Sequence, residues 1–256
     1  MWKYLLTHIN PIVKWGISVN LSSVIKTQGE IRIAYLDSKA FADEKLAPLV
    51  VCPGLSETAE DYLDFIKFML PRRTIVLSFR GRGLSDTPIH GYNLNDHVID
   101  LEQVIMDAQL RELHLMAFSR GVSYALGYTR RNNDRIKSLM LLDYPLEHRS
   151  MDEDWVHDYI EHYLKPTKRI ELIREEAVIG IQRDSTDEEL SIAFNKPVLL
   201  IYGGLEGSLI TTEQLERYKD SFNCIEIVRL ENSSHNIRDT EGAKLNQSIK
   251  EFIDKL

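Results

Sequence analysis

Short apolar runs of strand length recur along this chain and alternate with segments in which apolar residues repeat at helical spacing. The apolar runs occupy residues 49–52, 74–78, 113–118, 136–142, 198–202 and 224–230. The helical patterns occupy residues 59–69, 94–108, 122–131, 212–222 and 242–256. Nearly continuous apolar strands that alternate with helices are typical of a mostly parallel sheet covered on both faces. The pattern therefore predicts a doubly wound α/β fold.

Two earlier segments, 19–26 and 30–36, alternate more regularly between apolar and polar residues. Such alternation is typical of strands with one solvated face. We therefore expect these segments to form an antiparallel pair at one edge of the sheet.

The segment between Pro145 and Lys196 breaks this rhythm, because it contains helical patterns and no apolar run of strand length. Its apolar positions form two faces, one of Trp155, Tyr159, Ile160, Tyr163 and Leu164, the other of Ile170, Ile173, Ala177, Val178 and Ile181. We interpret residues 146–195 as a helical cap above the carboxyl ends of the strands, where α/β sheets bind ligands. Because no repeat or low-complexity linker sets it apart, we predict a single domain over residues 1–256 that carries this cap as a lid.

The first residues form an apolar face at helical spacing through Trp2, Leu5, Ile9 and Ile12/Val13. We expect a short helix docked on the body of the protein, with a homodimer contact or a membrane-surface contact as alternatives. The segment has neither the long apolar stretch nor the small-residue cleavage site of a secretory signal. Since no run of about 18 or more apolar residues occurs in the sequence, we predict no membrane span.

The charge balance is acidic, with 31 lysines and arginines against 39 aspartates and glutamates and a formal net charge of -8. Nucleic-acid binding needs a concentrated basic surface, so the composition argues against a nucleic-acid partner. The two cysteines, Cys52 and Cys224, lie far apart without a CxxC partner, which fits a reducing compartment and excludes a cysteine-ligated zinc site. We therefore predict a cytoplasmic protein that uses no metal and no organic cofactor.

One strand pattern runs directly into a tight turn and a helix at Ala117-Phe118-Ser119-Arg120-Gly121. Such a turn strains the backbone of its central residue and lifts that side chain clear of the sheet. The residues two before and two after it must be small, because strand and helix backbones nearly touch there. Ser119 would also lie at a helix N-terminus, where peptide dipoles favour negative charge. The sequence thus predicts Ser119 as a nucleophile, with an ordinary helix N-cap as the alternative.

A serine hydroxyl needs a base to remove its proton, and the base needs an acid to hold its tautomer. His235 lies in the polar loop after the last predicted strand, whereas the other histidines lie in the tail, a strand, a helix start or the insertion. Glu206 is the only carboxylate in the loop after the strand at 198–202, and it is our predicted acid. Asp143, at the end of the preceding strand, is the runner-up and is expected instead to cap the insertion.

A second glycine-containing turn, Pro53-Gly54-Leu55-Ser56, directly follows the strand pattern at 49–52. A glycine there lets the loop swing back, so that a following N–H points toward the serine. Together with the N–H of Arg120 it would form an oxyanion hole, worth ~3 kcal/mol per donor in the transition state. An ordinary Pro-Gly turn is the alternative.

From about Glu30 to the C-terminus the chain resembles the α/β-hydrolase superfamily, especially its small esterase-like members with a helical cap. The similar motifs are the Arg-Gly-x-Gly-x-Ser loop at Arg80-Gly81-Arg82-Gly83-Leu84-Ser85, the nucleophile elbow at 117–121 and the Gly-x-x-Asp acid loop at Gly203-Gly204-Leu205-Glu206. The chain order Ser119, Glu206, His235 is also the order of that fold. The resemblance implies an α/β-hydrolase fold, catalysis by these residues, and oxyanion donors from the backbones of Leu55 and Arg120.

Several positions depart from the family pattern. Pro53 and Ala117 stand where the family usually has histidine and glycine, and both leave the backbone roles possible. Glu206 replaces the family's aspartate, and Arg120 replaces a small or apolar residue. We expect Arg80 to brace its loop and Arg120 to pair with an acidic residue of the cap.

These residues predict a serine hydrolase that cleaves an ester-like bond of a small or medium-sized substrate through an acyl-enzyme. The aromatic side chains of Trp155, Tyr159 and Tyr163 would supply an apolar wall for the substrate, or else form the core of the cap. Cleavage of a carbon–carbon bond, a lactone or a thioester by the same residues stays open, as does acyl transfer to an acceptor other than water. A slowly reacting or non-catalytic protein that binds a small ligand is the alternative of another class.

Overall fold

An eight-stranded sheet forms the centre of the protein, whose computed structural model describes residues 12–14, 17–19, 21–26 and 30–256. The strand order is β12-β11-β8-β7-β5-β6-β4-β3. The strands are β3 (Ser22–Lys26), β4 (Arg32–Asp37), β5 (Leu49–Cys52), β6 (Thr74–Ser78), β7 (Leu113–Phe118), β8 (Ile136–Leu142), β11 (Val198–Gly203) and β12 (Ile225–Leu230). From β6 to β12 all neighbours are parallel, whereas β4 runs antiparallel to β6 and β3 antiparallel to β4. The predicted mostly parallel sheet with an antiparallel pair at one edge is confirmed.

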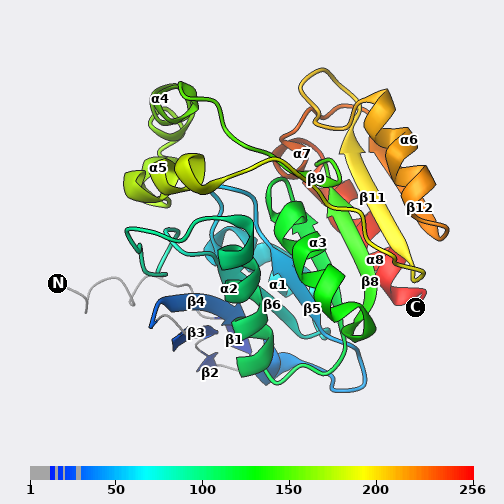
Figure 1. Cartoon of the computed structure of the whole chain (residues 1–256). Coiled ribbons are helices and arrows are strands. Elements are labelled where there is room, and N and C mark those ends of the chain that lie inside the picture. Colours follow the sequence, from blue (N-terminus) through cyan, green and yellow to red (C-terminus); the bar gives the residue numbers. More distant parts are fainter. Residues whose placement is uncertain (1–11, 15–16, 20, 27–29) are drawn as a thin grey trace.

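Helices cover both faces of this sheet, as Figure 1 shows. One face carries α2 (Leu94–Asp107), α3 (Gly121–Asn132) and α6 (Thr212–Ser221), and the other carries α1 (Leu63–Met69) and α8 (Gly242–Asp254). Alternate residues of one strand serve the two cores: Val50 and Cys52 pack with α2 and α3, while Leu49 and Val51 pack with α1 and α8. Burial on both faces explains why these strands read as unbroken apolar runs.

The segment before the sheet differs from its predicted structure where the chain is described. Ile12–Lys14 is strand β1, which pairs antiparallel with β2 (Ile17–Val19). The helical face predicted through Ile12/Val13 is therefore wrong at that end, because these residues satisfy their backbone hydrogen bonds in a two-stranded ladder. Trp2, Leu5 and Ile9, the rest of that face, lie outside the described residues.

The insertion between β8 and β11 stands beyond the carboxyl ends of the strands (Figure 1). Its helical segments are α4 (Trp155–Tyr159), a π-helix (Ile160–Leu164), a 3-10 helix (Arg169–Glu171) and α5 (Glu175–Asp184). The expectation that the insertion contains no strand is wrong, because β9 (Glu147–His148) pairs antiparallel with β10 (Glu188–Glu189). Two-residue strands of polar residues leave no apolar run for a sequence pattern to detect.

The insertion is hydrogen bonded to the loop that follows β6. Gly83 donates its N–H to Leu172 O at 2.8 Å, and Arg174 donates its N–H to Gly81 O at 3.1 Å. The insertion also has a core of its own, formed by Ile160, Leu164, Ile173, Ala177, Val178 and Ile181 together with Tyr92 of the main body. These contacts hold one side of the insertion against the loop that follows β6.

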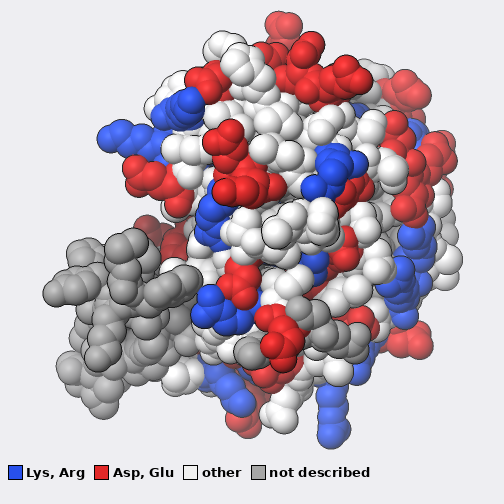
Figure 2. Space-filling model, turned by 60° about the vertical axis from the view of Figure 1, so that its left-hand side comes forward, with Lys and Arg blue, Asp and Glu red and all other residues white. Residues whose placement is uncertain are grey.

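Charged side chains of both signs mingle on the face drawn in Figure 2, where acidic groups crowd the upper part and lysines and arginines form no continuous basic area. No helix in the described ranges is long and apolar enough to cross a membrane.

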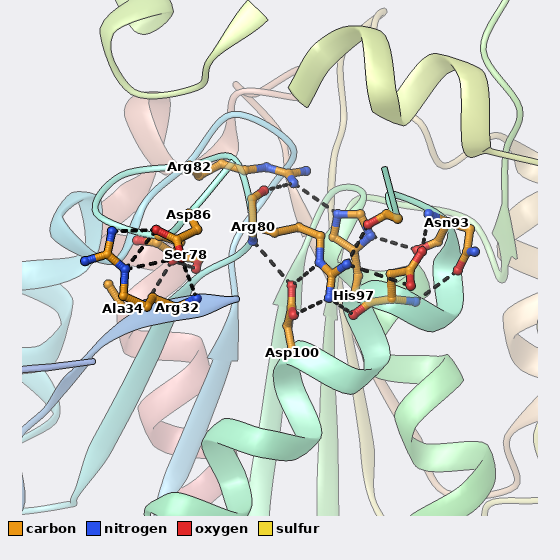
Figure 3. Close-up of polar contacts among 12 residues, drawn as sticks. Arg32, Ala34, Ser78, Arg80, Arg82, Asp86, Asn93, His97 and Asp100 are labelled. Carbon is orange, nitrogen blue, oxygen red and sulfur yellow. Dashed lines mark hydrogen bonds and ion pairs between the residues drawn. The ribbon is translucent and has the colours of Figure 1, made fainter. Parts of the chain in front are cut away.

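A buried ion pair braces the loop between β6 and α2. Arg80 donates from Nε and Nη2 to the two carboxylate oxygens of Asp100 at 2.8 and 2.6 Å, and Asp100 is completely buried. The same guanidinium donates to Gly91 O and Asp96 O at 2.6 and 3.0 Å. Figure 3 shows Arg80 facing Asp100. The predicted bracing role of Arg80 is thus confirmed.

Replacing Arg80→Met should destabilise the fold, because it leaves the Asp100 carboxylate buried without its partner. Breaking one half of a buried pair costs about 3–5 kcal/mol, and urea denaturation would measure the free energy of unfolding. Arg130→Met is the matched control, since it removes an exposed pair with Glu188 at 2.7 Å, and exposed pairs contribute about 1 kcal/mol or less. Equal losses in the two variants would contradict the bracing role.

Candidate active site

Ser119 occupies the tight turn between β7 and α3. Its φ is 52°, in the left-handed region that non-glycine residues rarely adopt. The turn is fixed from both sides: Ser119 donates its N–H to Leu142 O at 2.9 Å, and its carbonyl accepts from Val122 N–H at 2.8 Å. A Cβ on Gly121 would lie 2.4 Å from both Cys52 O and Pro53 O. The expected close approach of strand and helix backbones at Gly121 is therefore confirmed.

His235 lies beside this serine on the loop after β12. Its Nε2 is 2.9 Å from Ser119 Oγ, and its ring stacks on Phe118 with centroids 5.1 Å apart. The other ring nitrogen, Nδ1, is 2.7 Å from Asp143 Oδ2. Because a carboxylate only accepts hydrogen bonds, Nδ1 carries the hydrogen, and Nε2 is left with a lone pair for the serine hydroxyl.

Asp143 is completely buried directly after β8, also with a positive φ of 47°. Apart from His235 it accepts hydrogen bonds from Gly203 N–H at 3.0 Å, Ser208 Oγ at 2.5 Å and Leu209 N–H at 3.2 Å. These donors hold both carboxylate oxygens in place. The carboxylate is thereby fixed toward the imidazole.

The carboxylate beside His235 is Asp143, so the predicted placement of Glu206 there is wrong. Glu206 is exposed, and no hydrogen bond in the described part of the chain joins it to the imidazole. The loop after β11 meets the His235 loop through its backbone instead, since a Cβ on Gly203 would lie 2.1 Å from Ser234 O. That contact leaves no room for a side chain at position 203.

A signal for Asp143 was present in the sequence. It directly follows an apolar strand pattern, as Ser119 does, and the structure places β8 beside β7 in the sheet. Adjacent parallel strands end at the same edge, so residues that follow them lie close together. The expected role of Asp143 as a cap of the insertion is not what its hydrogen bonds show.

The loop after β5 lies against the serine turn. A Cβ on Gly54 would be 3.4 Å from Ser119 Cβ and 3.2 Å from Phe118 Cδ1. Leu55, the next residue, is held through its carbonyl, which accepts from Arg82 Nε at 2.9 Å. Within the described residues, neither the N–H of Leu55 nor that of Arg120 donates to another protein group. Of the two predicted oxyanion donors, Arg120 follows Ser119 in the chain and Leu55 belongs to the loop packed against it. The N–H hydrogens of both are free of hydrogen bonds to the described residues.

Glu57 connects this loop to the histidine loop, a link that the sequence analysis missed. Its Oε2 accepts from Gly54 N–H at 2.8 Å and from Tyr62 Oη at 2.6 Å. Its Oε1 pairs with Arg238, whose guanidinium also lies 3.7 Å from the centre of the Tyr62 ring. Because Arg238 is three residues after His235, the pair ties together two loops that meet at Ser119.

The three aromatic residues predicted to line the substrate form a stack on the insertion. Ring centroids are 4.9 Å apart for Trp155 and Tyr159 and 5.1 Å apart for Tyr159 and Tyr163. Trp155 and Tyr159 pack against the core of the insertion, as does Leu55, whereas Tyr163 is largely exposed. Burial raises the pKa of the Tyr159 phenol, so this hydroxyl stays protonated.

Arg120, directly after Ser119, has no ion pair with an acidic residue in the described part of the chain, so the expected pairing is wrong. It is 1% exposed and donates to Tyr124 Oη at 3.2 Å, Arg149 O at 3.1 Å, His148 Nε2 at 3.1 Å and Ser185 Oγ at 2.5 Å. The acceptors that the insertion provides for this guanidinium, Arg149 O, His148 Nε2 and Ser185 Oγ, are all uncharged. Among the described residues, no group of three or more His, Cys, Asp or Glu side chains is placed to hold a metal ion.

Comparison with known proteins gives a family match and a set of similar structures. A family model for the α/β-hydrolase fold matches residues 47–161, and no curated protein matches the chain. The similar structures include an esterase from Exiguobacterium antarcticum, with 17% identity, a TM-score of 0.74 and coverage of 91% of this chain and 99% of that one. An enol-lactonase from Burkholderia xenovorans has 16% identity, a TM-score of 0.73 and coverage of 91% of this chain and 100% of that one. A bromoperoxidase from Bacillus anthracis has 16% identity, a TM-score of 0.76 and coverage of 91% of this chain and 99% of that one. At such identities the likeness establishes the fold.

Gly121→Ala should destabilise the protein, because the new methyl group would overlap two backbone carbonyl oxygens that cannot move independently of β5. Overpacking of this kind costs about 1–3 kcal/mol or more, and thermal unfolding followed by circular dichroism would show it as a lower Tm. Gly242→Ala is the matched control, since nothing lies within 4 Å of a Cβ there and alanine favours helix over glycine. A Gly121→Ala variant as stable as the control would refute the close approach.

Proposed function

We propose that this chain, which has the α/β-hydrolase fold, is a serine hydrolase that cleaves an ester-like bond of a small or medium-sized substrate. One observation carries this proposal: a continuous relay from Ser119 Oγ through His235 to Asp143, with contacts of 2.9 and 2.7 Å. A hydroxyl, an imidazole and a buried carboxylate in that order are what acyl transfer through a serine requires.

The first half of the proposed reaction forms an acyl-enzyme. Ser119 Oγ attacks the ester carbonyl carbon while its proton passes to His235 Nε2, and the carbonyl oxygen becomes an oxyanion. The N–H groups of Leu55 and Arg120 donate to that oxygen, each contributing ~3 kcal/mol in the transition state. The C–O bond to the alcohol then breaks, and the leaving alkoxide takes the proton from the imidazolium.

The second half consumes water. His235 Nε2 accepts a proton from the water as its oxygen attacks the acyl carbon, and the same proton returns to Ser119 Oγ when that bond breaks. Asp143 keeps its negative charge throughout and stabilises the imidazolium. The products are the free carboxylic acid and the enzyme in its starting form. The side chain of His235 is 35% exposed, so water reaches the base.

Two of the structural neighbours have names that fit ester chemistry, while others of the same fold are named as a haloalkane dehalogenase, an epoxide hydrolase and a bromoperoxidase. An esterase and an enol-lactonase are among the proteins of the same fold. Transfer of an acyl group to water is common to both names, and it uses a nucleophile, a base and an oxyanion site of the kind assembled around Ser119.

Ser119→Ala should abolish hydrolysis of the best p-nitrophenyl ester found in an acyl-chain panel. Removing the nucleophile of a serine hydrolase lowers kcat by about 10⁶-fold, which places the variant at the detection limit of a p-nitrophenolate release assay. Unchanged thermal unfolding of the variant would show that the fold is intact. A variant with wild-type kcat would refute the proposed function.

Asp143→Asn should lower kcat by about 10⁴-fold, because an amide no longer selects the tautomer that presents the Nε2 lone pair to Ser119. Glu206→Gln is the matched control and should retain wild-type kcat, since Glu206 is exposed and the hydrogen bond of His235 Nδ1 goes to Asp143. Steady-state kinetics on the same ester would distinguish the two carboxylates. The reverse pattern, a large loss in Glu206→Gln alone, would contradict the assignment.

A further inference from the structure

Two guanidinium groups beneath the insertion have no acidic partner. Arg82 and Arg120 are each 1% exposed, and no ion pair within the described ranges reaches either of them. Arginine keeps its proton in proteins, so both charges persist. A buried charge without a counter-charge is strongly unfavourable. Arg80, nearby in the same loop, shows the usual solution in its pair with Asp100.

Three of the five N–H groups of Arg82 are used within the protein, all by neutral acceptors. Nε donates to Leu55 O at 2.9 Å, and Nη1 donates to Arg80 O at 2.6 Å and to His97 Nε2 at 3.0 Å. His97 Nδ1 donates to Asn93 O at 2.8 Å, so its Nε2 is an acceptor. Figure 3 shows Arg82 extended over this network. The remaining nitrogen, Nη2, is buried and has no hydrogen-bond partner among the described residues.

Burial and the neighbouring Arg82 charge hold the pKa of His97 well below its usual range, so this imidazole is neutral and adds no compensating charge of its own. The charge of Arg82 is therefore not balanced from the His97 side.

A second buried donor without a partner lies in the same region. The hydroxyl of Tyr92 is enclosed and has no hydrogen-bond partner in the described chain. The Tyr92 ring packs against α5 of the insertion, where a Cβ on Gly180 would lie 2.3 Å from it. Its hydroxyl is beside Gly81, since a Cβ there would be 3.4 Å away. Tyr92 Oη and the neighbouring Arg82 thus belong to one interface between the loop after β6 and the insertion.

Arg120 brings its charge to the same place from the nucleophile side. Its Nε donates to Tyr124 Oη at 3.2 Å, and the Tyr124 ring stacks on His97 with centroids 4.2 Å apart. Burial lowers the pKa of the Arg82 guanidinium, and the nearby Tyr124 phenol opposes that shift. Tyr124 and His97 therefore lie between the two guanidinium groups. One of these groups holds the carbonyl of Leu55, and the other follows Ser119 in the chain.

We propose that Arg82, Tyr92 and Arg120 form a subsite for a carboxylate, so that the substrate is an ester that also bears a free acid group. Arg82 Nη2 and Tyr92 Oη would donate to the carboxylate oxygens, and Arg120 would add its charge. A carboxylate only accepts hydrogen bonds, and it carries the negative charge that neither guanidinium group receives from an ion pair within the described residues. An ordered water would occupy the donors and leave the charge unbalanced. This inference rests on the proposed function for the reaction itself.

The kinetic test compares acid-bearing esters with neutral esters of the same length. The mono-p-nitrophenyl esters of succinate, glutarate and adipate are each paired with the p-nitrophenyl ester of the unbranched acid that lacks the terminal carboxylate. For the best-fitting length, wild-type kcat/KM should favour the acid-bearing ester by about tenfold or more, the worth of a hydrogen bond to a charged group. No preference at any of the three lengths would overturn the proposal.

Variants then assign the preference to the named residues. Arg82→Met should remove the tenfold preference, and Tyr92→Phe should reduce it severalfold. Tyr128→Phe is the matched control, because Tyr128 also has a buried hydroxyl without a hydrogen-bond partner but lies on α3 in the main core. It should keep the wild-type ratio. Tyr92→Phe removes no hydrogen bond of the free protein, so it decides the question even where Arg82→Met lowers the Tm. A preference that survives in both variants would overturn the proposal.

A binding measurement separates this inference from the proposed function. Monomethyl glutarate and methyl pentanoate are titrated calorimetrically into the Ser119→Ala variant, with and without Arg82→Met. The subsite is supported if monomethyl glutarate binds, methyl pentanoate does not, and Arg82→Met weakens the affinity for monomethyl glutarate at least tenfold. This result would support the subsite even if no ester is turned over. Equal binding of the two esters, or binding that Arg82→Met leaves unchanged, overturns the subsite even if esters are hydrolysed by Ser119.

Discussion

The contact between the backbone of α3 and the end of β5 is the constraint on which the candidate site depends. Gly121 lies so close to the carbonyl oxygens of Cys52 and Pro53 that no Cβ fits between them. The helix must therefore start immediately after β7, and the chain achieves this by placing Ser119 in the left-handed region. A strained residue of this kind persists only where its surroundings hold it, and here hydrogen bonds from both neighbouring segments do so. The hydroxyl is consequently presented above the sheet rather than buried in it.

The strand order then decides which side chains meet that hydroxyl. Since β8 lies next to β7 and β11 next to β8, the residue that follows β8 lies one strand from the Ser119 turn, whereas the loop after β11 lies two strands from it. Asp143 therefore contacts His235, while the loop after β11 contributes backbone and hydroxyl donors that hold the carboxylate. The Glu57–Arg238 pair ties the remaining two loops together from the other side of the sheet edge. The turns and loops that follow β5, β7, β8, β11 and β12 thus converge because parallel strands end at one edge.

Most of the fold could be predicted from the sequence, because strands buried on both faces leave unbroken apolar runs and their helices leave a regular apolar spacing. Ser119 and His235 could be predicted because each has a local signature or a characteristic place after a strand. Asp143 could not be distinguished from Glu206 in this way. Its position depends on β8 lying next to β7, and no local sequence pattern gives the order of the strands. The β9–β10 pair was missed because two-residue polar strands have no periodicity. Arg120 was misjudged because its neutral partners, His148 and Ser185, come from the far ends of the insertion.

The central claim is that the Ser119 hydroxyl is made nucleophilic by its neighbours, and covalent labelling tests it most directly. The protein would be treated with a fluorophosphonate and digested, and the modified residue identified by mass spectrometry. The account predicts rapid, stoichiometric modification at Ser119 and a labelling rate lower by orders of magnitude in Asp143→Asn. Labelling spread over several surface serines, or a Ser119 that reacts no faster than they do, would contradict it.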